Sequence, residues 1–250
     1  MSSRLDRHRT LLASLAVLAA IAVLLPPVAT QARHYVFAQA LQFGVLAFVV
    51  PALLVLGAPW RHARRVRRPV WPTWAVLVGF LLVAAAWRLP VMVDALARHW
   101  ALTLAEAVTL VGAGCALWLE LVASPPLTPR ISRPQRALFA AVAMWSVWAI
   151  GYILGFSGTA WFASYARPAG RGLSIMVDQQ IAAALLWAVP GVVCVPLVYV
   201  CLMSWLRDSA DPDGELGAVR SGLRASGQAA PRPPRGWSTS RQAPDRVPRS

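Results

Sequence analysis

The sequence predicts an all-α fold: a polytopic membrane helix bundle with six transmembrane helices and with both termini in the cytoplasm. Three observations predict it. The chain has 250 residues, of which 58% are hydrophobic and only 14% are charged, a balance that is unusual for a soluble globular domain. Its apolar residues gather in six runs, each long enough to cross a hydrocarbon layer of about 30 Å as a helix. Its arginines fall mainly between these runs and at the two ends of the chain.

The first apolar run, residues 11–30, follows a start that holds three arginines. We interpret it as a retained membrane anchor, because it is longer than the apolar region of an ordinary signal peptide. A cleaved signal peptide is the alternative, since Thr30 and Ala32 form a small-x-small cleavage pattern. Either choice leaves the topology of the remaining chain unchanged.

The other five runs cover approximately residues 35–57, 70–87, 100–123, 137–156 and 181–206. Prolines inside some runs do not exclude helices there, because neighbouring helices can satisfy the carbonyl groups that proline leaves free. The C-terminal segment differs, with eight arginines, five acidic residues, six prolines and almost no apolar periodicity. We therefore expect two parts, a transmembrane helix bundle at residues 1–206 and a disordered, basic cytoplasmic tail at residues 207–250.

The distribution of arginine sets the predicted orientation. The N-terminal segment, the second-to-third connection and the fourth-to-fifth connection together hold eleven arginines, whereas the alternate connections hold five. Because positively charged connections stay in the cytoplasm, both termini are predicted to be cytoplasmic. The net charge of +14 is therefore a topology signal, and we expect no nucleic-acid partner.

Common catalytic and metal-binding motifs are absent from the sequence. Its three cysteines lie within apolar runs and lack CxxC spacing, so neither a disulfide framework nor a zinc site is predicted. It contains no Walker loop, GxGxxG turn or HExxH motif. The candidate functional residues are therefore the few polar side chains inside or beside the apolar runs.

One of these, Glu106, lies within the fourth apolar run. A carboxylate inside a membrane span is costly and is by default a functional candidate that faces protein or a wet cavity. His99, Thr103 and Glu106 have the i, i+4, i+7 spacing of one helix stripe, which predicts a polar line with His99 at its mouth. The alternative is that Glu106 bonds a neighbouring helix and His99 is only an interfacial residue.

The second, fourth and sixth runs share one direction, and each carries polar residues near its predicted outer end. Three such helices can close around one outward-facing site. The predicted binding or docking residues are Gln42, Asp94, His99, Glu106, Asp178, Gln179 and Gln180. Single residues have simpler alternatives: Gln39 and Gln42 can hydrogen-bond between helices, and Asp178 can cap the last helix.

Four segments carry motifs whose order and spacing are informative. They are PALLVLGAP at residues 51–59, LPVMVDALARH at 89–99, the helix with Glu106, Gly114 and Trp118, and LSIMVDQQIAAALLW at 173–187. Together they resemble the polytopic CtaG-like assembly factors of caa-type cytochrome c oxidase in bacteria. The resemblance covers about residues 10–206. It implies the fold of that family, a role in assembling the oxidase, and a link to maturation of its copper centre.

The chain departs from the family pattern at most of its histidines. The positions that the resemblance would fill with histidine hold Gln39, Phe43, Arg88, Thr103 and Ala107. His99 is retained and is the one candidate metal ligand. Copper favours imidazole ligands, which phenylalanine, alanine and arginine cannot replace. We therefore expect a divergent member with no cofactor of its own, and copper bound through His99 is the alternative.

With these features, the resemblance implies a non-enzymatic assembly factor for cytochrome c oxidase in the bacterial cytoplasmic (inner) membrane. It would act at the outer face, with an oxidase subunit and the lipid bilayer as its partners. A second hypothesis keeps the fold but makes the protein a small-solute or metal-ion permease, in which Glu106 and Asp178 flank the path. An enzyme is not expected, because the sequence offers neither a nucleophile and base pair nor a full set of metal ligands.

Overall fold

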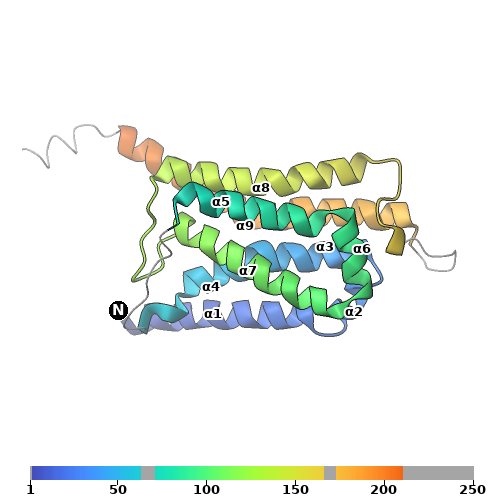
Figure 1. Cartoon of the computed structure of the whole chain (residues 1–250). Helices are drawn as coiled ribbons and strands as arrows, with labels where there is room; N and C mark the ends of the chain where they lie inside the picture. Colours follow the sequence, from blue (N-terminus) through green and yellow to red (C-terminus); the bar gives the residue numbers. More distant parts are fainter. Residues whose placement is uncertain (1, 63–70, 166–172, 211–250) are drawn as a thin grey trace, which may run out of the picture. The chain divides into compact units, whose positions relative to one another are not determined.

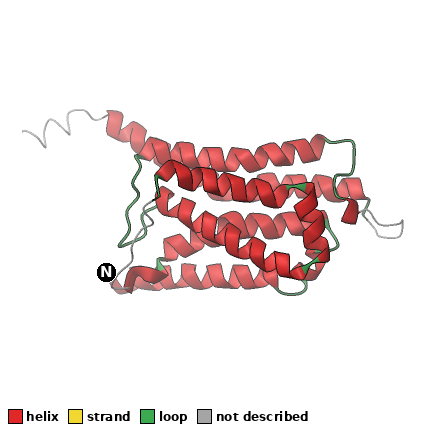
Figure 2. Ribbon diagram, in the orientation of Figure 1, coloured by secondary structure: helices red, strands yellow, loops and turns green. Residues whose placement is uncertain are grey.

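The structure, a computed structural model, describes residues 2–62, 71–165 and 173–210. Its regular elements are all helical (Figures 1 and 2), and this described part contains no β-strand. The elements are α1 (Ser2–Leu24), α2 (Val28–Ala32), α3 (Val36–Gly44), η1 (Val45–Val49), α4 (Val50–Gly57), η2 (Pro59–His62), α5 (Thr73–Arg88), α6 (Pro90–Arg98), α7 (Trp100–Leu121), α8 (Arg133–Phe156), η3 (Ala163–Tyr165) and α9 (Ile175–Ala210). The all-α prediction is therefore confirmed.

Five of the helices in the described residues are long and apolar enough to cross a membrane, and a sixth span results if α5 and α6 count as one. The two form a helix pair bent by 63°. The bend follows from Pro90, which disfavours a helical backbone at the residue before it. Leu89 accordingly has an extended backbone, with φ −60° and ψ 136°. Nearly all of the connection between the third and fourth predicted spans is helix α6.

The second predicted span is a nearly continuous helix made of α3, the π-helical turn η1 and α4. The π turn lies just before Pro51, which has no N–H and leaves the carbonyl group of Ala47 without its intrahelical donor. Of the five single-helix spans, this helix is the most buried, with 67% of its apolar segment buried against 39% or less in the other four. It therefore supplies the centre of the apolar core.

Other helices pack directly on this central helix. α1 and α7 both contact α4, and in Figure 1 α7 passes in front of it. The approach of α7 depends on Gly114, where an added Cβ would lie 2.5 Å from Cγ of Pro51 and 2.7 Å from the carbonyl oxygen of Ala47. α9 meets α3 at Gly44, whose Cβ position lies 3.0 Å from Val189. Small residues thus set the helix spacing, as in other membrane bundles.

Three short elements, α2, α6 and η3, connect the spans at one end of the bundle, which we call the α6 end (Figure 1). Contacts divide the chain into the units Met1–Leu206 and Arg207–Ser250. α9 continues to Ala210, so residues 207–210 of the predicted tail are helical. The rest of that tail, residues 211–250, lies outside the described residues.

The close contact at Gly114 generates a test of the packing. We expect Gly114→Ala to destabilise the protein by about 1–3 kcal/mol, because the new methyl group meets a backbone carbonyl group that cannot move away. Gly112, two residues away and on the exposed face of the same helix, is the matched control, since a Cβ there has no neighbour within 4 Å. Unfolding in detergent measures both variants, and equal stability of the two would contradict the packing described here.

Candidate functional site

A buried polar network joins three helices near the α6 end. It consists of Arg88 at the end of α5, Gln39 on α3 and Glu106 on α7. Arg88 donates from Nη2 to Oε1 of Gln39, and Nε2 of Gln39 donates to Oε1 of Glu106 at 3.0 Å. The amide of Gln39 has one acceptor and one donor end, so it bridges a cation and an anion in the one orientation that satisfies both.

Burial makes this network energetically important. Glu106 is fully buried and Arg88 is only 7% exposed, and isolated charges at such positions are very unfavourable. The guanidinium carbon of Arg88 also lies 4.4 Å from the ring centroid of Phe43, a cation–π geometry. Nε and Nη1 of Arg88 and Oε2 of Glu106 have no hydrogen-bond partner among the described residues. The hydrogen bonds through Gln39 therefore hold the network together, but three of its polar atoms have no hydrogen-bond partner in the described structure.

Tyr165 of η3 lies close to this network. Its hydroxyl group donates to the carbonyl oxygen of Ala32, at the end of α2, over 3.0 Å. Burial raises the pKa of the Tyr165 phenol above its ordinary value, and the charge of Arg88 opposes that shift only in part. The phenol is therefore a neutral donor that ties η3 to α2.

Three side chains in or beside the network lie at positions where the family resemblance would place histidines, namely Gln39, Phe43 and Arg88. The structure brings Arg88 into contact with the other two. Arg88 was missed as a site residue because the sequence placed it in an outer connection. The signal that would have found it is the buried carboxylate of Glu106, since a charge inside a span needs a nearby partner.

Asp178 and Gln179 serve helix ends and loops elsewhere in the fold. The two carboxylate oxygens of Asp178 accept hydrogen bonds from the backbone N–H groups of Val36 and Phe37, both at 2.9 Å. These are first-turn donors of α3 that no residue of α3 satisfies, and a negative charge there also favours the helix dipole. Asp178 thus caps α3 and not its own helix α9. Gln179 donates to the carbonyl oxygens of Leu154 and Thr159 and accepts from the backbone of Trp161.

Gln42 compensates for a proline. Its Nε2 donates to the carbonyl oxygen of Val23 at 2.9 Å. In a continuous helix that carbonyl group would accept from the residue four positions later, which is Pro27 and has no N–H. The buried side chain of Gln42 therefore donates to a carbonyl group at the end of α1 that lacks its usual backbone donor.

The remaining predicted residues lie at the surface or near it. Oδ1 of Asp94, on α6, accepts from the backbone N–H of Ser164 at 2.9 Å, which attaches η3 to α6. His99 is exposed and has an extended backbone, with φ −124° and ψ 106°, because α7 begins only at Trp100. The predicted helix stripe through His99 and Glu106 is therefore wrong. Gln180 is exposed.

The predicted set thus separates into two groups. Gln42, Asp94, Glu106, Asp178 and Gln179 bond other parts of the protein, whereas His99 and Gln180 face outward. Within the described ranges, no group of three or more His, Cys, Asp or Glu side chains is placed to hold a metal ion. Glu106 bonds Gln39, which bonds Arg88, and Arg88 packs on Phe43; glutamine, arginine and phenylalanine do not form a copper-binding set. These residues do not fit copper.

The bridging role of Gln39 can be tested by its removal. We expect Gln39→Leu to cost about 3–5 kcal/mol of stability, because it leaves the buried charges of Arg88 and Glu106 without their shared amide. The triple variant Gln39→Leu/Arg88→Met/Glu106→Leu should recover much of this loss, since it removes the charges together with the bridge. Thermal unfolding in detergent compares them, and a triple variant as unstable as the single one would count against the bridge.

The cap at Asp178 generates a second stability prediction. Asp178→Ala should lower stability by about 1–3 kcal/mol, because it leaves two backbone N–H groups of α3 without acceptors. Gln180→Ala, two residues away and exposed, should change stability by less than about 0.5 kcal/mol. Chemical unfolding of both variants, measured side by side, checks the difference. Similar small effects at the two positions would mean that Asp178 is not a cap.

Comparisons with known proteins give one match. The family model described as cytochrome c oxidase caa3 assembly factor (Caa3_CtaG) matches residues 2–208. No curated protein and no solved structure gives a significant match to the chain. The family match confirms the resemblance that the motifs indicated and spans the whole helix bundle described above. The chain therefore belongs to the Caa3_CtaG family of cytochrome c oxidase caa3 assembly factors.

Proposed function

We propose that the protein is a non-catalytic assembly factor that acts at the outer face of the bacterial cytoplasmic membrane and docks a cytochrome c oxidase subunit at its α6 end. The observation that carries the proposal is the family match over residues 2–208. The arginine distribution, which assigns the α6 end to the outer face, supports the orientation. The protein would contribute to maturation of the copper centre of the oxidase through this contact.

The polar groups of the α6 end support a docking role over a chemical one. Asp94, Asp178 and Gln179 fix α6, η3, α3 and the start of α9 against one another. A surface fixed in this way is preorganised, which lowers the entropic cost of binding a partner. The exposed residues His99 and Gln180 would form part of the contact, with Trp100, which is 67% exposed, as an adjoining aromatic anchor.

The buried side of α7 supports an assembly factor over a permease. Between Glu106 and Glu120, the buried residues of this helix are Ala107, Leu110, Gly114, Leu117 and Trp118. A path for a polar solute would need polar groups along this stretch, because an ion inside a bundle must exchange its water for other polar partners. The buried charge of Glu106 is instead connected sideways, through Gln39 to Arg88.

Deletion of the gene tests the assembly role. We expect membranes of the deletion strain to lose most of their active, copper-loaded cytochrome c oxidase, and the wild-type gene to restore it. Oxidase activity, the haem spectrum and the copper content of the purified oxidase provide the measurements. Normal amounts of copper-loaded oxidase in the deletion strain would reject the proposal.

Variants of the same strain separate docking from metal binding. His99→Gln keeps a hydrogen-bonding side chain but removes the imidazole, so it should restore the oxidase if His99 is a docking residue. His99→Glu/Gln180→Arg should lower oxidase activity several-fold, whereas Thr128→Ala, exposed at the other end of the bundle, should have no effect. Stoichiometric copper on the purified protein, abolished by His99→Gln, would replace the docking role with a metal-binding one.

A further inference from the structure

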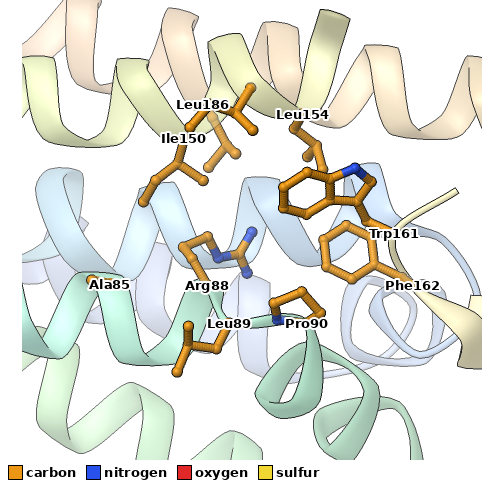
Figure 3. Close-up of a pocket in the computed structure, with 10 residues that line it drawn as sticks. Ala85, Arg88, Leu89, Pro90, Ile150, Leu154, Trp161, Phe162 and Leu186 are labelled. Carbon is orange, nitrogen blue, oxygen red and sulfur yellow. The ribbon is translucent and has the colours of Figure 1, made fainter. Parts of the chain in front are cut away.

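A cavity of about 220 Å³ lies beside the buried polar network, between α5, α8, α9 and the segment before η3. Figure 3 shows its walls, which are almost entirely apolar. Ile150, Leu154, Leu186 and Phe162 line it, and Trp161 forms part of one side. Leu89 and Ile153 also line it and are 53% and 52% exposed, so the cavity opens on the surface of the bundle between α5 and α8.

Arg88 is the one charged side chain in the wall of this cavity. Its guanidinium group lies among the apolar side chains of the cavity in Figure 3. Nη2 is used by Gln39, but Nε and Nη1, which carry three N–H groups, have no acceptor in the described part of the chain. Buried donors without acceptors are unfavourable, and more so on a charged group. Arg88 therefore brings a cation with three N–H groups, unpartnered among the described residues, to the wall of an apolar opening.

We propose that this cavity binds the acidic end of a membrane amphiphile, with its carboxylate or phosphate group on Arg88 and its acyl chain against the apolar walls. The guanidinium group suits both anions, since its hydrogen bonds to them are charge-assisted. The cavity is smaller than the roughly 300–1,000 Å³ that hold a drug-sized ligand, so only the acidic end and the first part of the chain fit. The rest of the chain leaves between Leu89 and Ile153 toward the bilayer.

The charge of Glu106 should affect the affinity of this cavity for an acidic ligand. It does not line the cavity, and it is connected to Arg88 through Gln39. Its negative charge competes with the ligand for the same cation, because two anions near one guanidinium group repel each other. Neutralising Glu106 should therefore strengthen binding of an acidic ligand, whereas a site that only holds water would not respond in this way.

Titration of the purified, full-length protein in a neutral detergent tests the proposal, with native mass spectrometry as the readout. The probes are oleic acid for a carboxylate, palmitoyl-oleoyl-phosphatidylglycerol for a phosphate, and oleyl alcohol as the uncharged comparison. We expect one or both acids to bind more tightly than the alcohol. Arg88→Gln should weaken binding of the acids roughly tenfold or more and leave the alcohol unaffected. Comparison of the affinities for the two acids shows whether the cavity prefers the carboxylate of a fatty acid or the phosphate of a phospholipid.

Three further variants complete the design. Arg98→Gln, which removes an exposed arginine at the same end of the bundle, should leave binding of the acids unchanged. Glu106→Gln should tighten it. Ala85→Phe fills the cavity from its exposed rim and leaves Arg88 itself in the sequence, so it should weaken binding of the acids and of the alcohol.

Acids that bind no better than the alcohol, or equal effects of Arg88→Gln and Arg98→Gln, would overturn the proposal, because Arg88 would then not be the group that binds the anion. If Arg88→Gln does not fold, the Ala85→Phe variant serves as the test. An unchanged affinity of that variant for the acids would contradict the proposal. The oxidase takes no part in these measurements. A failure here is therefore distinct from a failure of the proposed assembly role.

Discussion

The structure depends on one constraint: a polar group buried in an apolar helix bundle has to find its partner within the protein. The network of Arg88, Gln39 and Glu106 meets this constraint in part, at the point where three helices converge. Because a glutamine joins the two charges, the positions of α3, α5 and α7 are coupled through a single side chain. The same arrangement leaves donors of Arg88 without acceptors among the described residues, and Arg88 also forms part of the wall of an apolar cavity.

The same constraint explains the helix ends. Pro27 removes the donor that Val23 would have used, and Gln42 of another helix replaces it. The first turn of α3 has no cap of its own, and Asp178, far away in the sequence, supplies one. Polar residues that stand out in an apolar sequence are therefore not functional by that fact alone. In this bundle most of them complete hydrogen bonding that the backbone cannot complete by itself.

Much of the fold can be predicted from the sequence, because apolar length is a direct signal of a membrane helix. The predicted spans at residues 35–57, 100–123 and 137–156 lie close to Val36–Gly57, Trp100–Leu121 and Arg133–Phe156. The contacts of the site could not be predicted in the same way, since Asp178 and Val36 are 142 positions apart. The position of His99 was misjudged for a local reason, because an extended residue separates α6 from α7 and breaks the helical spacing.

The bend between α5 and α6 has a consequence for the surrounding lipid. α5 alone has 16 residues, which rise about 24 Å and so fall short of a hydrocarbon layer of about 30 Å. A hydrophobic segment that is too short is accommodated by local thinning of the bilayer. The membrane is therefore expected to be compressed on the α5 side of the protein, with lipid headgroups drawn inward toward the level at which this helix ends.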